Sequence, residues 1–141
     1  MQWKNTDDLR QEIAQTEDLG QFLKSNQSNF LSDDLPGALA RLLVQKNLTK
    51  AQVAKQAYIS EVYLHQIFSG RRKPSRDRLI CICIGMGASL EELQMLLHQC
   101  GYSQLYAHSR RDAIIMHGLM HKLPLQEIND TLFQEETETL F

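Results

Sequence analysis

The chain has 141 residues, of which 43% are hydrophobic and 23% are charged. This balance is typical of one folded domain and excludes a disordered chain. The longest apolar stretch, residues 79–84, is far shorter than the roughly 20 residues that cross a bilayer, and the first residues lack a signal-peptide pattern. We therefore expect a cytoplasmic protein with no membrane partner.

The formal charge of −2 conceals an uneven distribution along the chain. Residues 35–80 carry nine basic and two acidic side chains, whereas residues 1–34 carry three basic and seven acidic ones. Residues 125–141 carry five acidic side chains and no basic one. The middle of the chain therefore has the charge that attracts a polyanion, and its two ends do not.

Apolar residues recur with helical spacing almost throughout, which predicts an all-α fold. Proline at the first helical position, Ser or Thr caps and closing glycines mark the expected helix limits. In chain order they predict one or two helices before residue 25, then helices over about 35–46, 50–57, 61–68, 76–84, 90–100, 110–120 and 125–133.

These elements predict one structural domain, a compact helical bundle with extensions at both ends. We expect an acidic N-terminal helical extension over residues 1–34, a central unit over 35–95 and a C-terminal helical extension over 96–141 that packs on the core. The acidic tail, residues 134–141, is expected to fray. The sequence shows no evident internal repeat.

Three cysteines, Cys81, Cys83 and Cys100, lie in apolar helical stretches and are interpreted as buried reduced thiols. His117 and His121 are one helical turn apart, but no third metal ligand is evident nearby, so a surface pair is the preferred interpretation. We find no nucleophile elbow, phosphate-binding glycine loop or acid/base pair. The sequence therefore predicts no catalytic residue, metal or cofactor, and a protein that is not an enzyme.

Two short helices separated by about three residues form the most informative pattern. Val53 and Ala54 on the first helix and Leu64 and Ile67 on the second are placed to lock the pair at a steep angle, with Ile59 in the turn. Such a pair presents its second helix as a ridge that fits the DNA major groove. We therefore interpret residues 49–70 as a helix-turn-helix.

The sequence here resembles the lambda-repressor-like, Cro-type (XRE) helix-turn-helix family, over about residues 35–95 and a five-helix unit. The resemblance rests on Leu48-Thr49, Val53-Ala54, Ile59-Ser60, Leu64, Ile67, residues 69–75, Leu79 and residues 88–93. The flanks are similar to a group of short bacterial helix-turn-helix proteins of unsettled role. In those proteins a Gln-Ile-Phe-Ser-Gly segment precedes an Arg-Asp-Ala-Ile-Ile helix. The corresponding segments of this sequence are residues 66–70 and residues 111–115.

The resemblance implies a DNA-binding regulator of transcription. Bases would be contacted by the exposed face of the helix at 60–69, namely Ser60, Glu61, Val62, Tyr63, His65 and Gln66. Phosphates would be contacted by Thr49, Lys50, Gln52, Arg71, Arg72, Lys73 and Arg76. Relatives bind paired half-sites, so the expected partners are double-stranded DNA and a second copy of the chain. The contacts between copies are expected from Met95, Leu96, Met116 and Met120.

The sequence departs from the family in two places. Tyr58 stands where the family usually has glycine, so a slightly altered turn is expected. No Arg or Lys lies on the second helix. Three alternatives therefore stay open. The first is that the chain is a protein-interaction adaptor with the same fold. The second is that the motif is only a way of packing three helices, and the third is that the acidic ends cover the basic surface.

Overall fold

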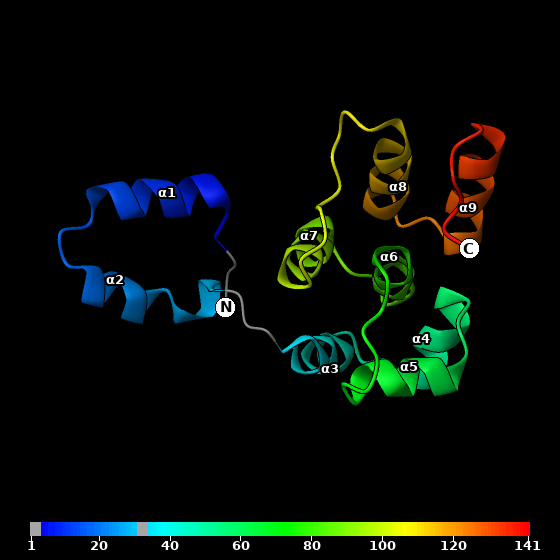
Figure 1. Ribbon diagram of the computed structural model, residues 1–141, viewed down its shortest axis with the longest axis horizontal. Helices are drawn as coiled ribbons and strands as arrows, with labels where there is room; N and C mark the ends of the chain where they lie inside the picture. The colour runs from blue at the N-terminus through cyan, green and yellow to red at the C-terminus, as the bar shows by residue number, and fades with distance from the viewer. Residues whose placement is uncertain (1–3, 31–33) are drawn as a thin grey trace. The chain divides into compact units, whose positions relative to one another are not determined.

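The structure is a computed structural model that describes residues 4–30 and 34–141 (Figure 1). Within these ranges the regular elements are nine α-helices and one short 3-10 helix, which confirms the all-α prediction. The helices are α1 (Thr6–Gln15), α2 (Leu19–Ser25), η1 (Gln27–Asn29), α3 (Leu35–Gln45), α4 (Lys50–Ala57), α5 (Glu61–Phe68), α6 (Arg76–Gly85), α7 (Leu90–Gln99), α8 (Arg110–Met120) and α9 (Leu125–Gln134). The chain divides into two compact units, Met1–Ser32 and Asp33–Phe141.

The N-terminal unit is held together mainly by polar contacts. The one buried apolar side chain among residues 4–30 is Phe22. The Lys4 ammonium donates to the Glu12 carboxylate at 2.7 Å and to the Asn26 amide oxygen at 2.8 Å. The Asn26 amide in turn donates to Glu12 at 3.0 Å, and Asn26 is fully buried. The hydrogen bonds from Asn26 and Lys4 lower the pKa of Glu12, so this carboxylate stays ionised in the fold.

In the second unit, caps place the helices where the local sequence predicts them. Thr49 and Gln52 form a reciprocal capping box, with hydrogen bonds of 3.2 and 2.9 Å between side chain and backbone. Ser89 and Glu92 form a second one. Each box satisfies two N–H groups that the helix itself leaves without a partner. Side-chain oxygens of Asp34, Ser60, Ser75 and Ser109 cap the starts of α3, α5, α6 and α8.

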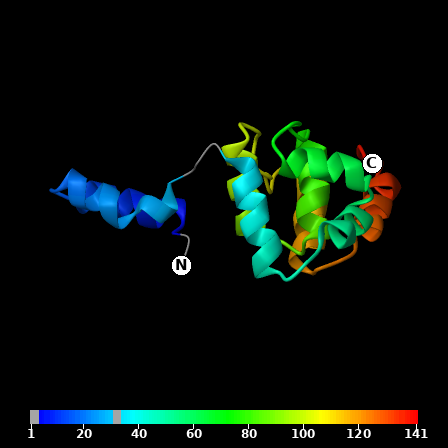
Figure 2. The ribbon, with the colours of Figure 1, turned by 90° about the horizontal axis from the view of Figure 1, so that it is seen from below.

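Helix α6 forms the centre of the second unit. Five consecutive residues, from Leu79 to Cys83, are completely buried. Figure 1 shows α6 nearly end-on, with α3, α4 and α5 on one side and α7, α8 and α9 around the rest, and Figure 2 shows the same unit from below. A helix that is apolar all round requires such cover on every face.

The helical pairs α6–α7 and α8–α9 repeat one another at a spacing of 35 residues, so the expectation of no internal repeat is wrong. Gly87 and Lys122 both adopt a positive φ before the second helix of their pair. Gly101 and Glu136 do so after it. Residue types also carry the repeat, because Arg-Asp occurs at 76–77 and 111–112 and leucines recur at 90 and 125 and at 105 and 140. The positive φ does not show in the second copy, where Lys and Glu replace glycine.

The two repeats are joined by reciprocal ion pairs between equivalent residues. Arg76 of the first repeat contacts Asp112 of the second at 3.2 Å. Arg111 of the second contacts Asp77 of the first through both carboxylate oxygens, each at 3.1 Å. Arg76 and Arg111 are 35 residues apart, as are Asp77 and Asp112. The contact is therefore pseudo-symmetric, like that between two copies related by a twofold axis.

The segment after each repeat is anchored in the same way. The Gln94 side chain accepts from the Leu105 N–H at 2.7 Å, and the Asn129 side chain accepts from the Leu140 N–H at 2.6 Å. Both leucines are buried. The expectation that residues 134–141 fray is therefore wrong, because partners distant in sequence fix their backbone. The same two arginines donate to backbone carbonyls of these segments, Arg76 to Ser103 and Gln104, and Arg111 to Glu138 and Thr139.

We expect Asp112→Asn to lower the free energy of unfolding by roughly 1.5–3 kcal/mol, the range for hydrogen bonds to charged groups. The reason is that Arg76 loses its counter-charge where the two side chains are only 22% and 10% exposed. Urea denaturation followed by circular dichroism measures the loss.

The control is Glu135→Gln, which removes the counter-charge of Arg110 in a pair whose side chains are 67% and 50% exposed. It should cost about 0–1 kcal/mol. Equal losses in the two variants would contradict a structural role for the reciprocal pairs.

Candidate nucleic-acid interface

Helices α4 and α5 pack as the sequence predicts. Val53 and Ala54 of α4 and Leu64 and Ile67 of α5 are buried, and Ile59 in the turn is half-buried. The Ile59 N–H donates to the Ala54 carbonyl at 3.1 Å, which closes the turn against the end of α4. The apolar residues of both helices thus face the core and leave the other side of α5 to solvent.

Tyr58 adopts the left-handed conformation in this turn, with φ 55° and ψ 41°. The turn therefore keeps the backbone that a glycine would allow, instead of the altered one expected. A left-handed conformation costs a non-glycine residue about 1–2 kcal/mol. The Tyr58 ring stacks on Phe141, with centroids 4.9 Å apart and planes 12° apart. Such a pair contributes about 0.5–1.5 kcal/mol beyond its buried area, enough to offset much of the strain.

The solvent-facing side of α5 presents the predicted base-contacting residues to different degrees. Glu61, Val62 and His65 are exposed, with Val62 69% exposed. Tyr63 and Gln66 are half-buried at the edge of this face. Ser60 precedes the helix, and its hydroxyl accepts the Tyr63 N–H at 3.0 Å. Its side chain therefore caps α5, and its O–H is still free to donate to another group.

The start of α4 offers N–H donors. The Gln52 side chain accepts from the Thr49 N–H and the Thr49 hydroxyl accepts from the Gln52 N–H, so both side-chain oxygens take part in the cap. The N–H groups of Lys50 and Ala51 belong to the first turn, which has no partners within the helix. Such groups, with the positive end of the helix dipole, suit a phosphate. Lys50 adds a charge beside them, with its ammonium 5.2 Å from the Phe68 ring centroid.

Arg71 and Arg72 lie just beyond the end of α5 and are exposed. The Arg72 guanidinium lies over the Tyr63 ring, 5.5 Å from its centroid, which places a positive charge beside the solvent-facing side of α5. Lys50 of α4 contacts the same helix through Phe68. Positive charge therefore borders α5, although the helix carries none of its own.

Two predicted phosphate contacts are engaged elsewhere. Arg76 is bound by Asp112 and by two backbone carbonyls, so it has a structural role and leaves the set of phosphate contacts. Lys73 donates to the Cys100 carbonyl at 2.7 Å and lies over the Tyr102 ring. Lys46 pairs with Glu92 at 3.1 Å. Three of the nine basic side chains in residues 35–80 are thus bound by nearby carboxylates or carbonyls. A count of formal charges does not reveal this.

The comparisons with known proteins agree with this geometry. Residues 39–93 match the family model described as Helix-turn-helix. This segment is a helix-turn-helix domain. The match confirms the lambda-repressor-like resemblance from α3 to the start of α7, while the similarity of the flanks to short bacterial proteins stays a prediction. No curated protein and no solved structure matches the chain.

Some residues that shape the helix-turn-helix domain escaped the sequence analysis. Phe141 reaches the turn from the far end of the chain, and Asp112 neutralises Arg76 from 36 residues away. No local pattern signals either contact. The sign that was available is the 35-residue repeat, which places Arg-Asp at both 76–77 and 111–112 and leucines at both 105 and 140.

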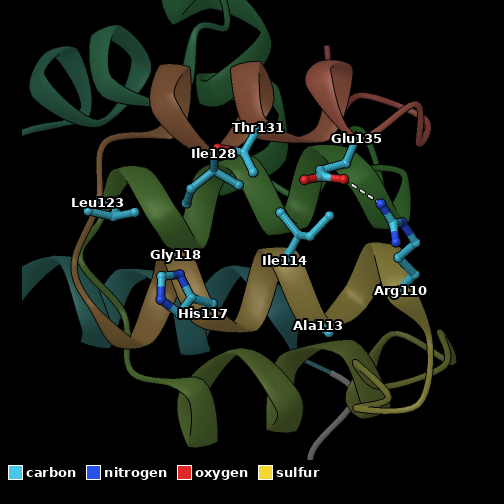
Figure 3. Close-up of a pocket in the computed structure, with 9 residues that line it drawn as sticks. All are labelled: Arg110, Ala113, Ile114, His117, Gly118, Leu123, Ile128, Thr131 and Glu135. Atoms are coloured by element: carbon cyan, nitrogen blue, oxygen red, sulfur yellow. Dashed lines mark hydrogen bonds and ion pairs between the residues drawn. The ribbon is translucent and has the colours of Figure 1, made fainter.

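Outside the helix-turn-helix domain, α8 and α9 border a groove of about 370 Å³ (Figure 3). Ile114 and Ile128 face each other across it, and Arg110 and Glu135 pair at one end. Gly118 allows this close packing, because a Cβ there would lie 2.3 Å from Ile128 Cγ1. The groove is thus an apolar depression with both signs of charge at one end.

The histidine pair lies beside this groove. His117 lines it, its ring is tilted by 33° against that of His121 with centroids 4.2 Å apart, and both residues are exposed. Among residues 4–30 and 34–141, no three His, Cys, Asp or Glu side chains are grouped to hold a metal ion. Over the same ranges, no helix is both long and apolar enough to span a membrane.

All three cysteines are buried free thiols, as the sequence predicts. Burial raises the pKa of Cys81 to about 11, and it raises the pKa of Cys83 and Cys100 above the ordinary value as well. The reactive thiolate is therefore scarce at neutral pH.

In the native protein at neutral pH, we expect Ellman's reagent to react with these thiols only as fast as the fold opens. Absorbance at the reagent's product band measures the rate, and unfolding in guanidinium should release all three thiols at once. Rapid reaction of one thiol without denaturant would contradict the inert role that burial assigns to them.

Proposed function

We propose that this protein binds double-stranded DNA by placing α5 in the major groove and that it regulates transcription. The observation that carries the proposal is the helix-turn-helix domain itself, in which Leu64 and Ile67 anchor α5 in the core while its other side faces solvent. A helix supported from behind and open in front has the shape that the major groove admits.

The proposed roles follow from exposure and chemistry. Val62 contacts a thymine methyl group, Gln66 forms a bidentate contact with adenine, and Glu61 accepts from cytosine N4. Phosphates are bound by Lys50, Arg71, Arg72 and the N–H groups at the start of α4. Ser60, Tyr63 and His65 complete the surface of α5, Thr49 and Gln52 shape the start of α4, and Lys73 lies at the edge of the basic region.

We expect affinity for a random DNA duplex to fall steeply with salt. With three or four phosphates neutralised, log affinity against log salt should have a slope of about −3 to −4. Removing two of these contacts with Arg71→Ala and Arg72→Ala together should reduce the slope by about 2. Fluorescence anisotropy of a labelled duplex over a salt series measures both.

The matched control is Arg10→Ala with Lys24→Ala, which removes the same formal charge from exposed positions in the N-terminal unit. This variant should keep the wild-type slope. Salt-independent binding, or no binding, would contradict DNA as the ligand.

One feature favours the adaptor alternative, namely that residues 61–68 include no Arg or Lys while Val62 is widely exposed. An adaptor would show no salt-dependent affinity for DNA in the same experiment. It would instead retain one protein through the Val62 surface, and Val62→Glu would abolish that retention.

We further propose that the protein acts as a dimer through the α8–α9 groove. Leu79, the repeat equivalent of Ile114, is completely buried in the first repeat, whereas Ile114 is only half-buried and lines the groove of the second repeat. Arg110 and Glu135 pair with each other at one end of the groove, so that end presents both signs of charge to a second copy. Of the contacts expected from the sequence, Leu96 is excluded because it is completely buried, while Met120 is exposed.

We expect the wild type to sediment as a dimer at tens of micromolar and Ile114→Glu to sediment as a monomer, because the new charge would be buried between the copies. Analytical ultracentrifugation measures both. Val44→Glu, at a 79% exposed position on α3, is the control and should remain dimeric. A monomeric wild type would refute the proposed interface.

A further inference from the structure

The C-terminal segment, residues 137–141, lies against the turn of the helix-turn-helix domain. Figures 1 and 2 both place the C-terminus beside the end of α4, where the turn begins. Phe141 stacks there on Tyr58, the residue whose left-handed backbone connects α4 to α5. Phe141 is 41% exposed, so the stack is a surface contact rather than part of the core.

Hydrogen bonds with Asn129 and Arg111 hold this segment in place. The Asn129 side chain accepts from the Leu140 N–H and donates to the Phe141 carbonyl at 3.1 Å. The Arg111 guanidinium donates to the Glu138 carbonyl at 2.7 Å. Leu140 itself is 4% exposed. The Phe141 ring is thus presented to Tyr58 by a fixed backbone.

The internal repeat indicates that this anchoring is built into the fold. In the first repeat, Gln94 and Arg76 hold the segment that contains Leu105 through equivalent hydrogen bonds. The second repeat holds its own segment in the same way. The two segments differ in what they contact, because the second one lies against the turn that orients the proposed recognition helix.

We propose that residues 137–141 are a positioning element for DNA binding, in which Phe141 holds Tyr58 in the left-handed conformation and so sets the angle between α4 and α5. This inference rests on the proposed function. DNA binding of this kind needs the start of α4 on a phosphate and the face of α5 on the bases at the same time, so a change in their angle weakens both.

The opposite role for the same segment is restraint. The chain carries acidic residues at 135, 136 and 138, and a tail that repelled or covered the duplex would reduce binding. The two roles predict opposite signs. Loss of the Phe141 ring weakens DNA binding if the segment positions the turn and strengthens it if the segment restrains binding.

The experiment compares Phe141→Ala with wild type by anisotropy of a labelled duplex at fixed salt. We expect affinity to fall about three- to tenfold, the factor that corresponds to one aromatic stack. Phe133→Ala, which removes a 76% exposed phenylalanine from α9, is the matched control and should bind as wild type. In a Tyr58→Gly background, Phe141→Ala should have no further effect, because glycine adopts the turn without strain and has no ring to stack.

A second measurement does not depend on DNA. Hydrogen exchange of the Ile59 amide, which donates to the Ala54 carbonyl, should accelerate in Phe141→Ala and stay unchanged in Phe133→Ala. If the wild type binds no duplex, the proposed function fails, and unchanged Ile59 exchange separately overturns the positioning role. Equal or tighter DNA binding by Phe141→Ala also overturns it.

Discussion

The second unit depends on two arginine–aspartate pairs that cross between equivalent helices. Arg76 and Arg111 each bind the aspartate of the other repeat and the backbone of the segment after their own. One guanidinium has enough fixed donors to serve several acceptors at once, which a lysine ammonium does less specifically. Because these groups lie at the starts of α6 and α8, they fix the two helical pairs relative to one another.

The same pairing alters the electrostatics of the proposed interface. Arg76 lies within the basic part of the sequence, yet its charge is balanced by Asp112 inside the fold. What remains near α5 is Lys50, Arg71 and Arg72, at the edges of a helix that has no Arg or Lys of its own. Affinity in such an arrangement comes from the phosphates, while discrimination between bases depends on a few uncharged contacts.

Local features of the sequence predict much of this fold. The capping boxes at Thr49 and Ser89 involve residues three positions apart, so they and the helix limits follow from the sequence. The left-handed Tyr58 was not predicted, because a tyrosine in the place of glycine indicated an altered turn. The docking of the acidic tail does not follow from local sequence either, because Asn129 and Arg111 act on it from a distance. The repeat could have been found from the Arg-Asp dipeptides and leucines that recur 35 residues apart, although the positive φ at Lys122 and Glu136 is not indicated by residue type as it is at Gly87 and Gly101.

The reciprocal pairs also bear on where this domain can be divided. The family match ends at residue 93, within α7, so it includes α6 but leaves out the second repeat. A fragment cut near that limit would keep Arg76 and Asp77 but lose Asp112 and Arg111, and α6 would lose the cover of α9. The compact unit therefore extends through the second repeat to Phe141, well past the boundary that the family match alone would draw.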